Sequence, residues 1–191
     1  MNVLNIGGGA KGIELPAHYD GFEKIWLDID ERLEPDICLD VRELITLDAK
    51  QFDAVFGSHI LEHIYPHELQ NVLDGCYRII KDERWCEFHV PDCKAAIMMA
   101  AQNQGNLGTP LYTSPAGIVT VRDMLWGYAS FVADFGAAQA HKDGFTSESL
   151  YAALRKAGFN YIFMGAGSYE IAAVAFKQNP SDEVKARLGF A

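Results

Sequence analysis

Short apolar runs separated by polar or glycine-rich breaks make up most of the first ninety residues. Runs of this length that end in glycine or polar residues are typical of buried β-strands. The predicted strands cover residues 2–6, 24–28, 36–39, 52–56 and 85–90. Residues 66–81 instead carry apolar side chains at helical spacing behind a first-position proline, which predicts an amphipathic helix. This alternation predicts a parallel sheet covered on both faces.

The last fifty residues return to a regular pattern. Thr146 predicts the N-cap of a helix that ends at Gly158. Two strands follow, at 159–164 and 169–176, and the linker 165–168 is too short for a parallel crossover, so they must form an antiparallel hairpin. The predicted fold is therefore an α/β, Rossmann-like open sheet of seven strands. It is mostly parallel, with an antiparallel terminal hairpin and helices on both faces.

Residues 92–143 interrupt this regular pattern. Gly, Pro and Thr cluster within 105–120, and aromatic residues are scattered. A connection of this length is usually functional or forms a small subdomain. We expect residues 1–191 to form one domain, in which 92–143 is an inserted substrate lid or a small subdomain. Tyr112, Trp126 and Tyr128 are then candidate walls for a substrate, and ordinary packing over the sheet is the alternative.

Composition narrows the class of protein. Hydrophobic residues make up 49% of the 191 residues and charged residues 22%, as in ordinary globular proteins. No apolar run approaches the roughly 20 residues of a membrane span, and the N-terminal residues do not resemble a signal peptide. The four cysteines are widely spaced, so we expect reduced thiols and a cytoplasmic location, without a membrane partner. The formal charge of −10 would repel polyanions, so no nucleic-acid partner is expected, whereas oligomerisation is left open.

A glycine cluster ends the first predicted strand. Gly7, Gly9 and Gly12 have the spacing of a dinucleotide-binding loop, in which glycine permits positive φ and close approach of a ligand. Asp28 ends the second strand, where a carboxylate can accept both hydroxyl groups of a ribose. These residues predict a nucleotide-containing ligand. A glycine-rich bend that binds nothing is the alternative.

Other polar residues also follow predicted strands, at the edge where open α/β sheets bind ligands. Asp40, beside Val41, could accept the amino group of an adenine, or simply cap a turn. Two features argue against a dinucleotide as the ligand. Pro16 shortens the helix after the glycines, and the chain ends in a hairpin. A dinucleotide places its pyrophosphate on the N-terminus of a full helix, and the hairpin is not expected in an NAD-type dehydrogenase.

Several stretches together resemble the type 11 group of class I S-adenosylmethionine (SAM) methyltransferases. They are residues 4–9, Asp28, 36–44, 52–63, and 77–81 with the strand that leads to Val90 and Pro91. The resemblance covers about residues 2–92 and, more loosely, 141–146 and the final hairpin. It implies SAM as cofactor, S-adenosylhomocysteine as product, and an oxygen or nitrogen acceptor on a small molecule or sugar.

The same resemblance implies the residues that surround the cofactor. They are Asn5, Gly7, Gly8, Gly9, Asp28, Ile29, Asp40, Val41, Ser58 and His59. The glycine loop would pack against the methionine part, with Lys11 and Gly12 as the exit of the turn. Asp28 would bind the ribose, whereas Asp40 and Val41 would lie near the adenine. Ser58 and His59 would face the sulfonium.

The chain departs from this group in three respects. Asn5 stands where many members carry an acid, residues 82–84 replace the usual Pro-Gly-Gly turn, and the helix that usually precedes the first strand is missing from the sequence. The last departure leaves a catalytically inactive SAM-binding partner subunit as an alternative function. An NAD-type oxidoreductase is the other alternative.

Three histidines are candidate general bases, because histidine titrates near neutral pH. They are His59, His63 and His141, and a structural contact is the alternative for His63. Residues 59–63 also match the H-x-x-E-H pattern of zinc proteases. Helix signals begin only at Pro66 and no third ligand is apparent, so no metal is expected.

Overall fold

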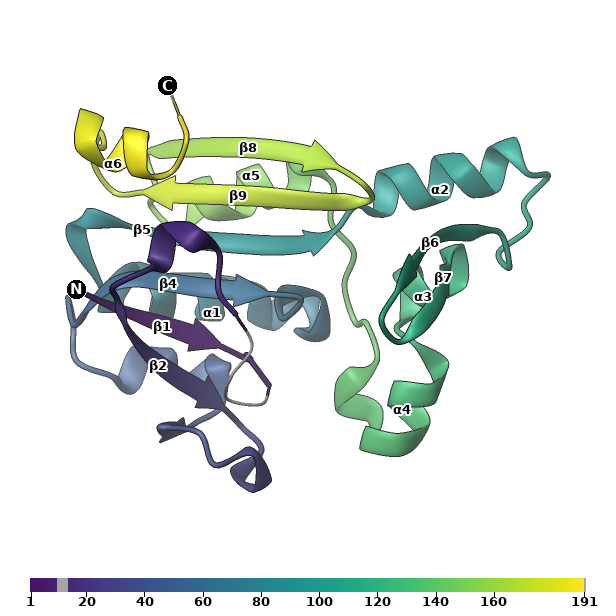
Figure 1. Ribbon diagram of the computed structural model, residues 1–191, viewed down its shortest axis with the longest axis horizontal. Coiled ribbons are helices and arrows are strands. Elements are labelled where there is room, and N and C mark those ends of the chain that lie inside the picture. The colour runs from purple at the N-terminus through teal and green to yellow at the C-terminus, as the bar shows by residue number, and fades with distance from the viewer. Residues whose placement is uncertain (10–13, 191) are drawn as a thin grey trace.

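A seven-stranded mixed sheet forms the body of the computed structural model, which describes residues 1–9 and 14–190 (Figure 1). Its strands, in spatial order, are β3 (Ile37–Cys38), β2 (Glu23–Asp28), β1 (Asn2–Ile6), β4 (Phe52–Ser58), β5 (Ile80–Pro91), β9 (Glu170–Phe176) and β8 (Tyr161–Gly167). The first five are parallel, whereas β9 runs antiparallel to both β5 and β8. The fold predicted from the sequence is confirmed. The turn exit predicted at Lys11 and Gly12 lies outside the described residues.

The two faces of the sheet are covered unequally. One face packs against α1 (Pro66–Ile79), α5 (Ser147–Lys156) and the 3₁₀ helix η3 (Val41–Thr46), which share a large apolar core with it. The other face packs against the short 3₁₀ helix η1 (Ala17–Tyr19) and α6 (Asp182–Arg187). The 3₁₀ helix η1, at Ala17–Tyr19, is only three residues long.

The predicted turn at residues 82–84 is wrong, because β5 already begins at Ile80 and runs through these residues. The pairing of β4 with β5 is irregular here, between Phe52 and Ala54. Asp53, between these two residues, forms ion pairs with Lys81 at 3.0 Å and Arg84 at 3.2 Å. These charges hold the irregular segment against the sheet.

The turn of the terminal hairpin lies closer to the C-terminus than the predicted linker at 165–168. The predicted linker at 165–168 is mostly strand, and the turn consists of Ser168 and Tyr169, with φ of 53° and 66°. Positive φ at both central residues is the geometry of a type I′ hairpin turn. Glu170 therefore begins β9 directly opposite Pro91, at the edge of the sheet where the parallel strands end.

Residues 92–143 form a separate lobe beyond the carboxyl ends of the strands, which we call the insert lobe (Figure 1). Its elements are α2 (Cys93–Gln102), β6 (Pro110–Ser114), β7 (Gly117–Thr120), the 3₁₀ helix η5 (Ala137–Gln139), α3 (Val121–Trp126) and α4 (Ala129–Phe135). A small apolar cluster around Ala96, Ala100, Val121 and Met124 holds it together. Its role as a substrate lid stays a prediction.

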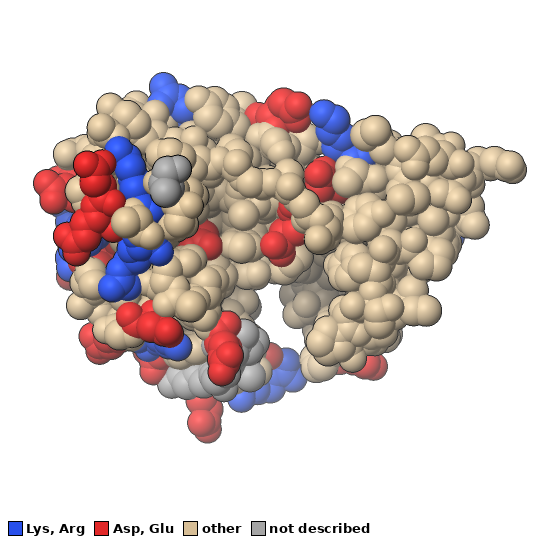
Figure 2. Space-filling view, turned by 45° about the horizontal axis from the view of Figure 1, so that its top comes forward, with Lys and Arg blue, Asp and Glu red and all other residues tan. Residues whose placement is uncertain are grey.

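The insert lobe is poor in charge on the face drawn in Figure 2, where a hollow separates it from the body of the sheet. The four cysteines, all of which lie in the described part, are free thiols. Among the described helices, none combines the length and the apolar character needed to cross a membrane.

Substitution of Gly75 by Ala is expected to destabilise the fold, although Ala normally favours a helix interior by about 1 kcal/mol. A Cβ on Gly75 would lie 2.7 Å from the Cβ of Leu44 and 3.2 Å from the main-chain nitrogen of Ile45, so η3 would have to move away from α1. We expect a loss of about 1–3 kcal/mol in the free energy of unfolding, measured with urea. The exposed neighbour Asp74→Ala is the control and should change it by less than about 0.5 kcal/mol. A Gly75→Ala protein more stable than wild type would contradict this packing.

Candidate functional site

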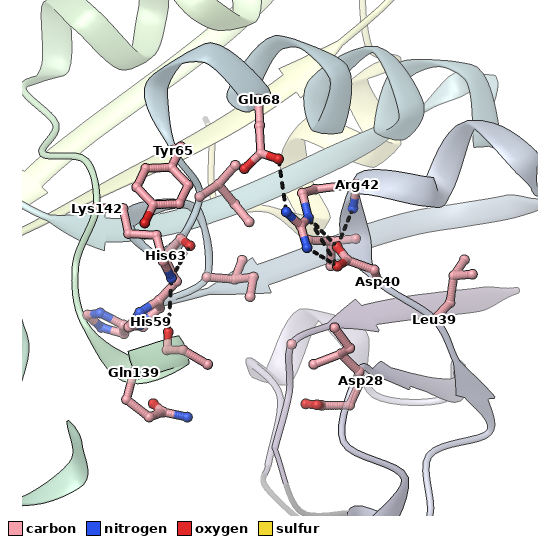
Figure 3. A pocket seen from close by; sticks show the side chains of 16 residues that line it. Asp28, Leu39, Asp40, Arg42, His59, His63, Tyr65, Glu68, Gln139 and Lys142 are labelled. Atoms are coloured by element: carbon pink, nitrogen blue, oxygen red, sulfur yellow. Dashed lines mark hydrogen bonds and ion pairs between the residues drawn. The ribbon is translucent and has the colours of Figure 1, made fainter. Parts of the chain in front are cut away.

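A cavity of about 250 Å³ opens at the carboxyl ends of β1, β2 and β4 (Figure 3). We call it the strand-end cavity. Six of the ten residues predicted to surround a cofactor line it: Gly7, Asp28, Ile29, Asp40, Val41 and His59. The insert lobe closes it from the other side with Ala138, Gln139 and Lys142. The remaining four predicted residues, Asn5, Gly8, Gly9 and Ser58, lie next to these on β1, its loop and β4.

The glycine loop is shaped by close contacts. Gly7 and Gly9 both have φ of 63°, and a Cβ on Gly7 would lie 2.4 Å from Cδ1 of Ile60. A Cβ on Gly8 would lie 2.2 Å from Nδ2 of Asn5, which is only 2% exposed. Asn5 therefore supports the loop from beneath. Glycine leaves the main chain of this loop bare for close approach of a ligand.

Asp28 is fixed by the main chain around it. Its Oδ2 accepts a hydrogen bond from the nitrogen of Gly9 at 3.3 Å, and its Oδ1 accepts one from the nitrogen of Asp30 at 2.9 Å. Figure 3 shows the carboxylate pointing into the strand-end cavity. Each oxygen keeps a further lone pair, so the group can still accept hydrogen bonds from a ligand.

Asp40 is bound to its own helix as well as facing the cavity. It caps η3 by accepting from the nitrogen of Arg42 at 2.9 Å, and it accepts from Nε of the same residue at 3.0 Å. These hydrogen bonds from Arg42 lower the pKa of Asp40. Arg42 in turn donates to Glu68 at 2.9 Å, which ties η3 to α1 (Figure 3). The capping role considered for Asp40 is thus present, and its contact with an adenine stays a prediction.

His59 follows β4 with a left-handed backbone, at φ of 52°. Its Nδ1 lies 3.1 Å from Oε1 of Glu62, and its Nε2 lies 3.2 Å from Oε2 of Glu170. Burial of the ring favours the neutral form, but the hydrogen bonds to Glu170 and Glu62 outweigh it and raise the pKa of His59 to about 10. A protonated ring that donates from both nitrogens has no lone pair for a proton, so this geometry does not support His59 as a general base.

A row of alternating carboxylates and imidazoles continues from His59 across the sheet. Glu170 also binds Nδ1 of His89 at 3.0 Å, and Nε2 of His89 lies 2.9 Å from Oε1 of Glu87. The other oxygen of Glu87 lies 2.7 Å from Nε2 of His18. We call these six side chains the acid–imidazole row; in order they are Glu62, His59, Glu170, His89, Glu87 and His18.

Mutual hydrogen bonding sets the charge of this row. The bonds to Glu170 and Glu87 raise the pKa of His89 to about 9. Burial would raise the pKa of Glu87, but hydrogen bonds from its three partners, Tyr19 among them, lower it to about 2. The two histidines bound to Glu170 lower its pKa to about 2 in the same way. The four central members, His59, Glu170, His89 and Glu87, are therefore charged near neutral pH.

Sequence reasoning did not find Glu87, His89 or Glu170. Glu87 and His89 lie two apart on β5, so both point to one face of the sheet, and this polar pair inside an apolar strand was the available signal. Glu170 had no local signal, because it reaches the row only through the pairing of β9 with β5.

A second cavity, of about 280 Å³, lies between the sheet and the insert lobe. We call it the lobe cavity. It is lined by the predicted walls Tyr112 and Tyr128, together with Phe131. Trp126, the third predicted wall, is 54% exposed and is not one of its lining residues. The two cavities share His59, His63 and Gln139, so ligands in them would lie next to each other.

The other two candidate bases meet in the lobe cavity. The rings of His63 and His141 lie 5.0 Å apart, with the buried Glu62 beside them. Nδ1 of His63 lies 3.2 Å from the carbonyl of Ala140, so the structural contact considered for His63 is present. Burial lowers the pKa of His141. In addition, residues 61–63 form a 3₁₀ turn, so His59 and His63 do not share a helix face as the zinc-protease pattern requires.

Comparison with known proteins relates this fold to methyltransferases. No protein-family model matches the chain. Over 80 residues, 42% of this chain, it is 28% identical to the mitochondrial ubiquinone biosynthesis O-methyltransferase of Rattus norvegicus, and the match spans only 21% of that relative.

Solved structures match over nearly the whole chain. A SAM-dependent methyltransferase from Archaeoglobus fulgidus aligns with a TM-score of 0.59 at 17% identity, over 91% of this chain and 85% of that one. The 1,6-didemethyltoxoflavin-N1-methyltransferase of Burkholderia thailandensis, crystallised with 1,6-didemethyltoxoflavin and S-adenosylhomocysteine, aligns with a TM-score of 0.55 at 16% identity, over 93% of this chain and 71% of that one. The methyltransferase fold predicted from the sequence is confirmed.

Removal of His89 from the acid–imidazole row should change how stability depends on pH. The folded pKa of about 9 lies above the unfolded value of about 6.5, so the contribution of His89 is fully present below pH 6.5 and is lost as the pH rises through 9. The stability difference between wild type and His89→Gln, measured by urea unfolding, should therefore shrink from about pH 6 to about pH 10. The exposed His67→Gln is the control and should follow the wild type at every pH. A pH-independent difference for His89→Gln would contradict the ion pairing.

Proposed function

We propose that the protein is a SAM-dependent methyltransferase that acts on an oxygen or nitrogen atom of a small molecule. The observation that carries the proposal is that six residues predicted to surround the cofactor line one cavity, at the carboxyl ends of the strands of a methyltransferase fold. The relatives named above are methyltransferases, and one was crystallised with S-adenosylhomocysteine. Neither an NAD-type oxidoreductase nor an inactive partner subunit has such support.

The residues of the strand-end cavity fit this cofactor. The bare main chain at Gly7 and Gly9 suits the methionine part, and the carboxylate of Asp28 suits the two ribose hydroxyls. Leu39 and Val41 provide apolar walls for an adenine. SAM supplies a methyl group that its positive sulfur already activates. The protein therefore has to orient the acceptor in line with that methyl group and exclude water.

The lobe cavity is the proposed acceptor site. It borders the strand-end cavity at His59, His63 and Gln139, so an acceptor in it would lie beside the methyl donor. Tyr112 and Tyr128 give it aromatic walls, and the lobe around it carries few charges (Figure 2). These features suit a small organic acceptor, and they support the proposed role of the insert lobe as a substrate lid.

Substitution of Asp28 by Ala should weaken the binding of S-adenosylhomocysteine. Hydrogen bonds to a charged group contribute about 1.5–3 kcal/mol, so we expect a loss of about 10- to 100-fold in affinity by isothermal titration calorimetry. Glu31→Ala, an exposed acid on the following turn, should bind as the wild type does. Wild-type protein that binds NAD and not S-adenosylhomocysteine would overturn the proposed function.

Incubation with methyl-labelled SAM and a panel of small hydroxyl and amine compounds should separate an enzyme from a SAM-binding subunit. We expect label transfer to at least one acceptor, and less transfer by Asp28→Ala at limiting SAM. Binding of S-adenosylhomocysteine without transfer to any acceptor would favour the inactive subunit.

A further inference from the structure

Three side chains at the floor of the lobe cavity remain unexplained by SAM binding. Glu62, His63 and His141 each offer one ligand atom, and these atoms all lie within 4.8 Å of one another. Glu62 is only 1% exposed. Its Oε1 is bonded to His59, whereas its Oε2 has no hydrogen-bond partner within the part of the chain that the structure describes. A buried carboxylate oxygen without a hydrogen-bond partner destabilises the fold, because its lost hydration is not replaced. A cation bound beside it would compensate for that loss.

His63 and His141 are each oriented by a hydrogen bond to a main-chain carbonyl, as metal-binding histidines commonly are. Nδ1 of His63 lies 3.2 Å from the carbonyl of Ala140, and Nδ1 of His141 lies 2.9 Å from the carbonyl of Met124. A carbonyl only accepts, so both Nδ1 atoms carry the proton. A ring that carries its single proton on Nδ1 has a lone pair on the second nitrogen. Fixing one ring nitrogen on a carbonyl so that the other can bind a metal is the usual arrangement around metal-binding histidines.

We propose that Glu62, His63 and His141 bind one divalent transition-metal ion of the zinc, manganese or iron(II) type. Two imidazoles and one carboxylate are a donor set that such ions accept, and they leave further coordination positions open. The site differs from the zinc-protease pattern of residues 59–63, because His59 is bonded to two carboxylates and His141 takes its place. The sequence indicated no third ligand because His141 lies 78 residues after His63.

The open positions would face the lobe cavity, which Glu62, His63 and His141 line. The acceptor that we assign to this site rests on the proposed function. It is a small molecule with a hydroxyl group next to a second oxygen, so that both oxygens can bind the ion. The cation lowers the pKa of that hydroxyl, whose proton leaves to solvent. The acceptor oxygen then forms the bond to the methyl carbon, and the electrons of the broken carbon–sulfur bond stay on sulfur.

The surrounding main chain keeps the three ligands in place. The carbonyl of Glu62 accepts from the nitrogens of Lys142 and Asp143, at 2.7 and 3.1 Å. Nζ of Lys142 donates to the carbonyl of His63 at 2.9 Å (Figure 3). His141 therefore reaches the cluster on a segment that is already fixed to the loop after β4.

Titration of metal-free protein with Co²⁺ tests the site, because the visible absorption of the ion reports its ligands. We expect one Co²⁺ per chain, displaced by Zn²⁺, with affinity at least about tenfold weaker in His141→Gln and in Glu62→Gln. The exposed His67→Gln should bind as the wild type does. Absence of saturable binding, or unchanged binding in both ligand variants, would overturn the proposal.

Titration of the same proteins with S-adenosylhomocysteine separates this proposal from the proposed function. Retained binding in His141→Gln would show that the variant is folded and that loss of Co²⁺ is local. If the wild type binds Co²⁺ and not S-adenosylhomocysteine, the metal site stands and the proposed function fails. If it binds S-adenosylhomocysteine and not Co²⁺, the metal site fails alone.

The choice of acceptor has its own assay with labelled SAM and 1,2-dihydroxybenzene as the probe. Transfer that requires added metal and is lost in His141→Gln would support an oxygen acceptor held by the ion. Equal transfer by metal-free and metal-loaded protein would overturn this role.

Discussion

The buried carboxylate of Glu62 is the group on which the arrangement of the site depends. The main-chain carbonyl of Glu62 accepts hydrogen bonds from the nitrogens of Lys142 and Asp143, at the end of the insert lobe. Its side-chain Oε1 is hydrogen-bonded to the ring of His59. A buried carboxylate persists in a fold only where partners compensate for its lost hydration. The loop after β4 and the end of the insert lobe are therefore both fixed to this one residue, the first through its side chain and the second through its main chain.

Two strained turns bring the partners of this carboxylate together. His59 has φ of 52°, and the hairpin turn has positive φ at Ser168 and Tyr169. Such backbone in a residue other than glycine costs about 1–3 kcal/mol. Hydrogen bonds between charged groups contribute about 1.5–3 kcal/mol each, and His59 makes two of them, to Glu62 and Glu170. Solvent screens the half-exposed pair with Glu170, so the contact with the buried Glu62 makes the larger contribution against the cost of the left-handed backbone at the end of β4.

The parts of the fold that follow from local pattern could be predicted, and those that follow from long-range pairing could not. Gly7 follows β1 directly, Asp28 is the last residue of β2, and Val41 lies three residues after the end of β3, so their place at one edge follows from the parallel sheet. Glu170 joins His89 only because β9 inserts beside β5, and His141 joins His63 only through the folding of the insert lobe. That lobe packs through small residues such as Ala96 and Ala100, which leave little periodicity in the sequence.

The insert lobe couples the two cavities physically. Its last residues serve both, since Lys142 lines the strand-end cavity, His141 lines the lobe cavity and Gln139 lines both. The same residues are fixed to the loop after β4 through the carbonyls of Glu62 and His63. Movement of the lobe away from this loop would open both cavities at once. Two ligands that both favour the closed arrangement, one in each cavity, would each strengthen the binding of the other by the same factor, because linkage is reciprocal.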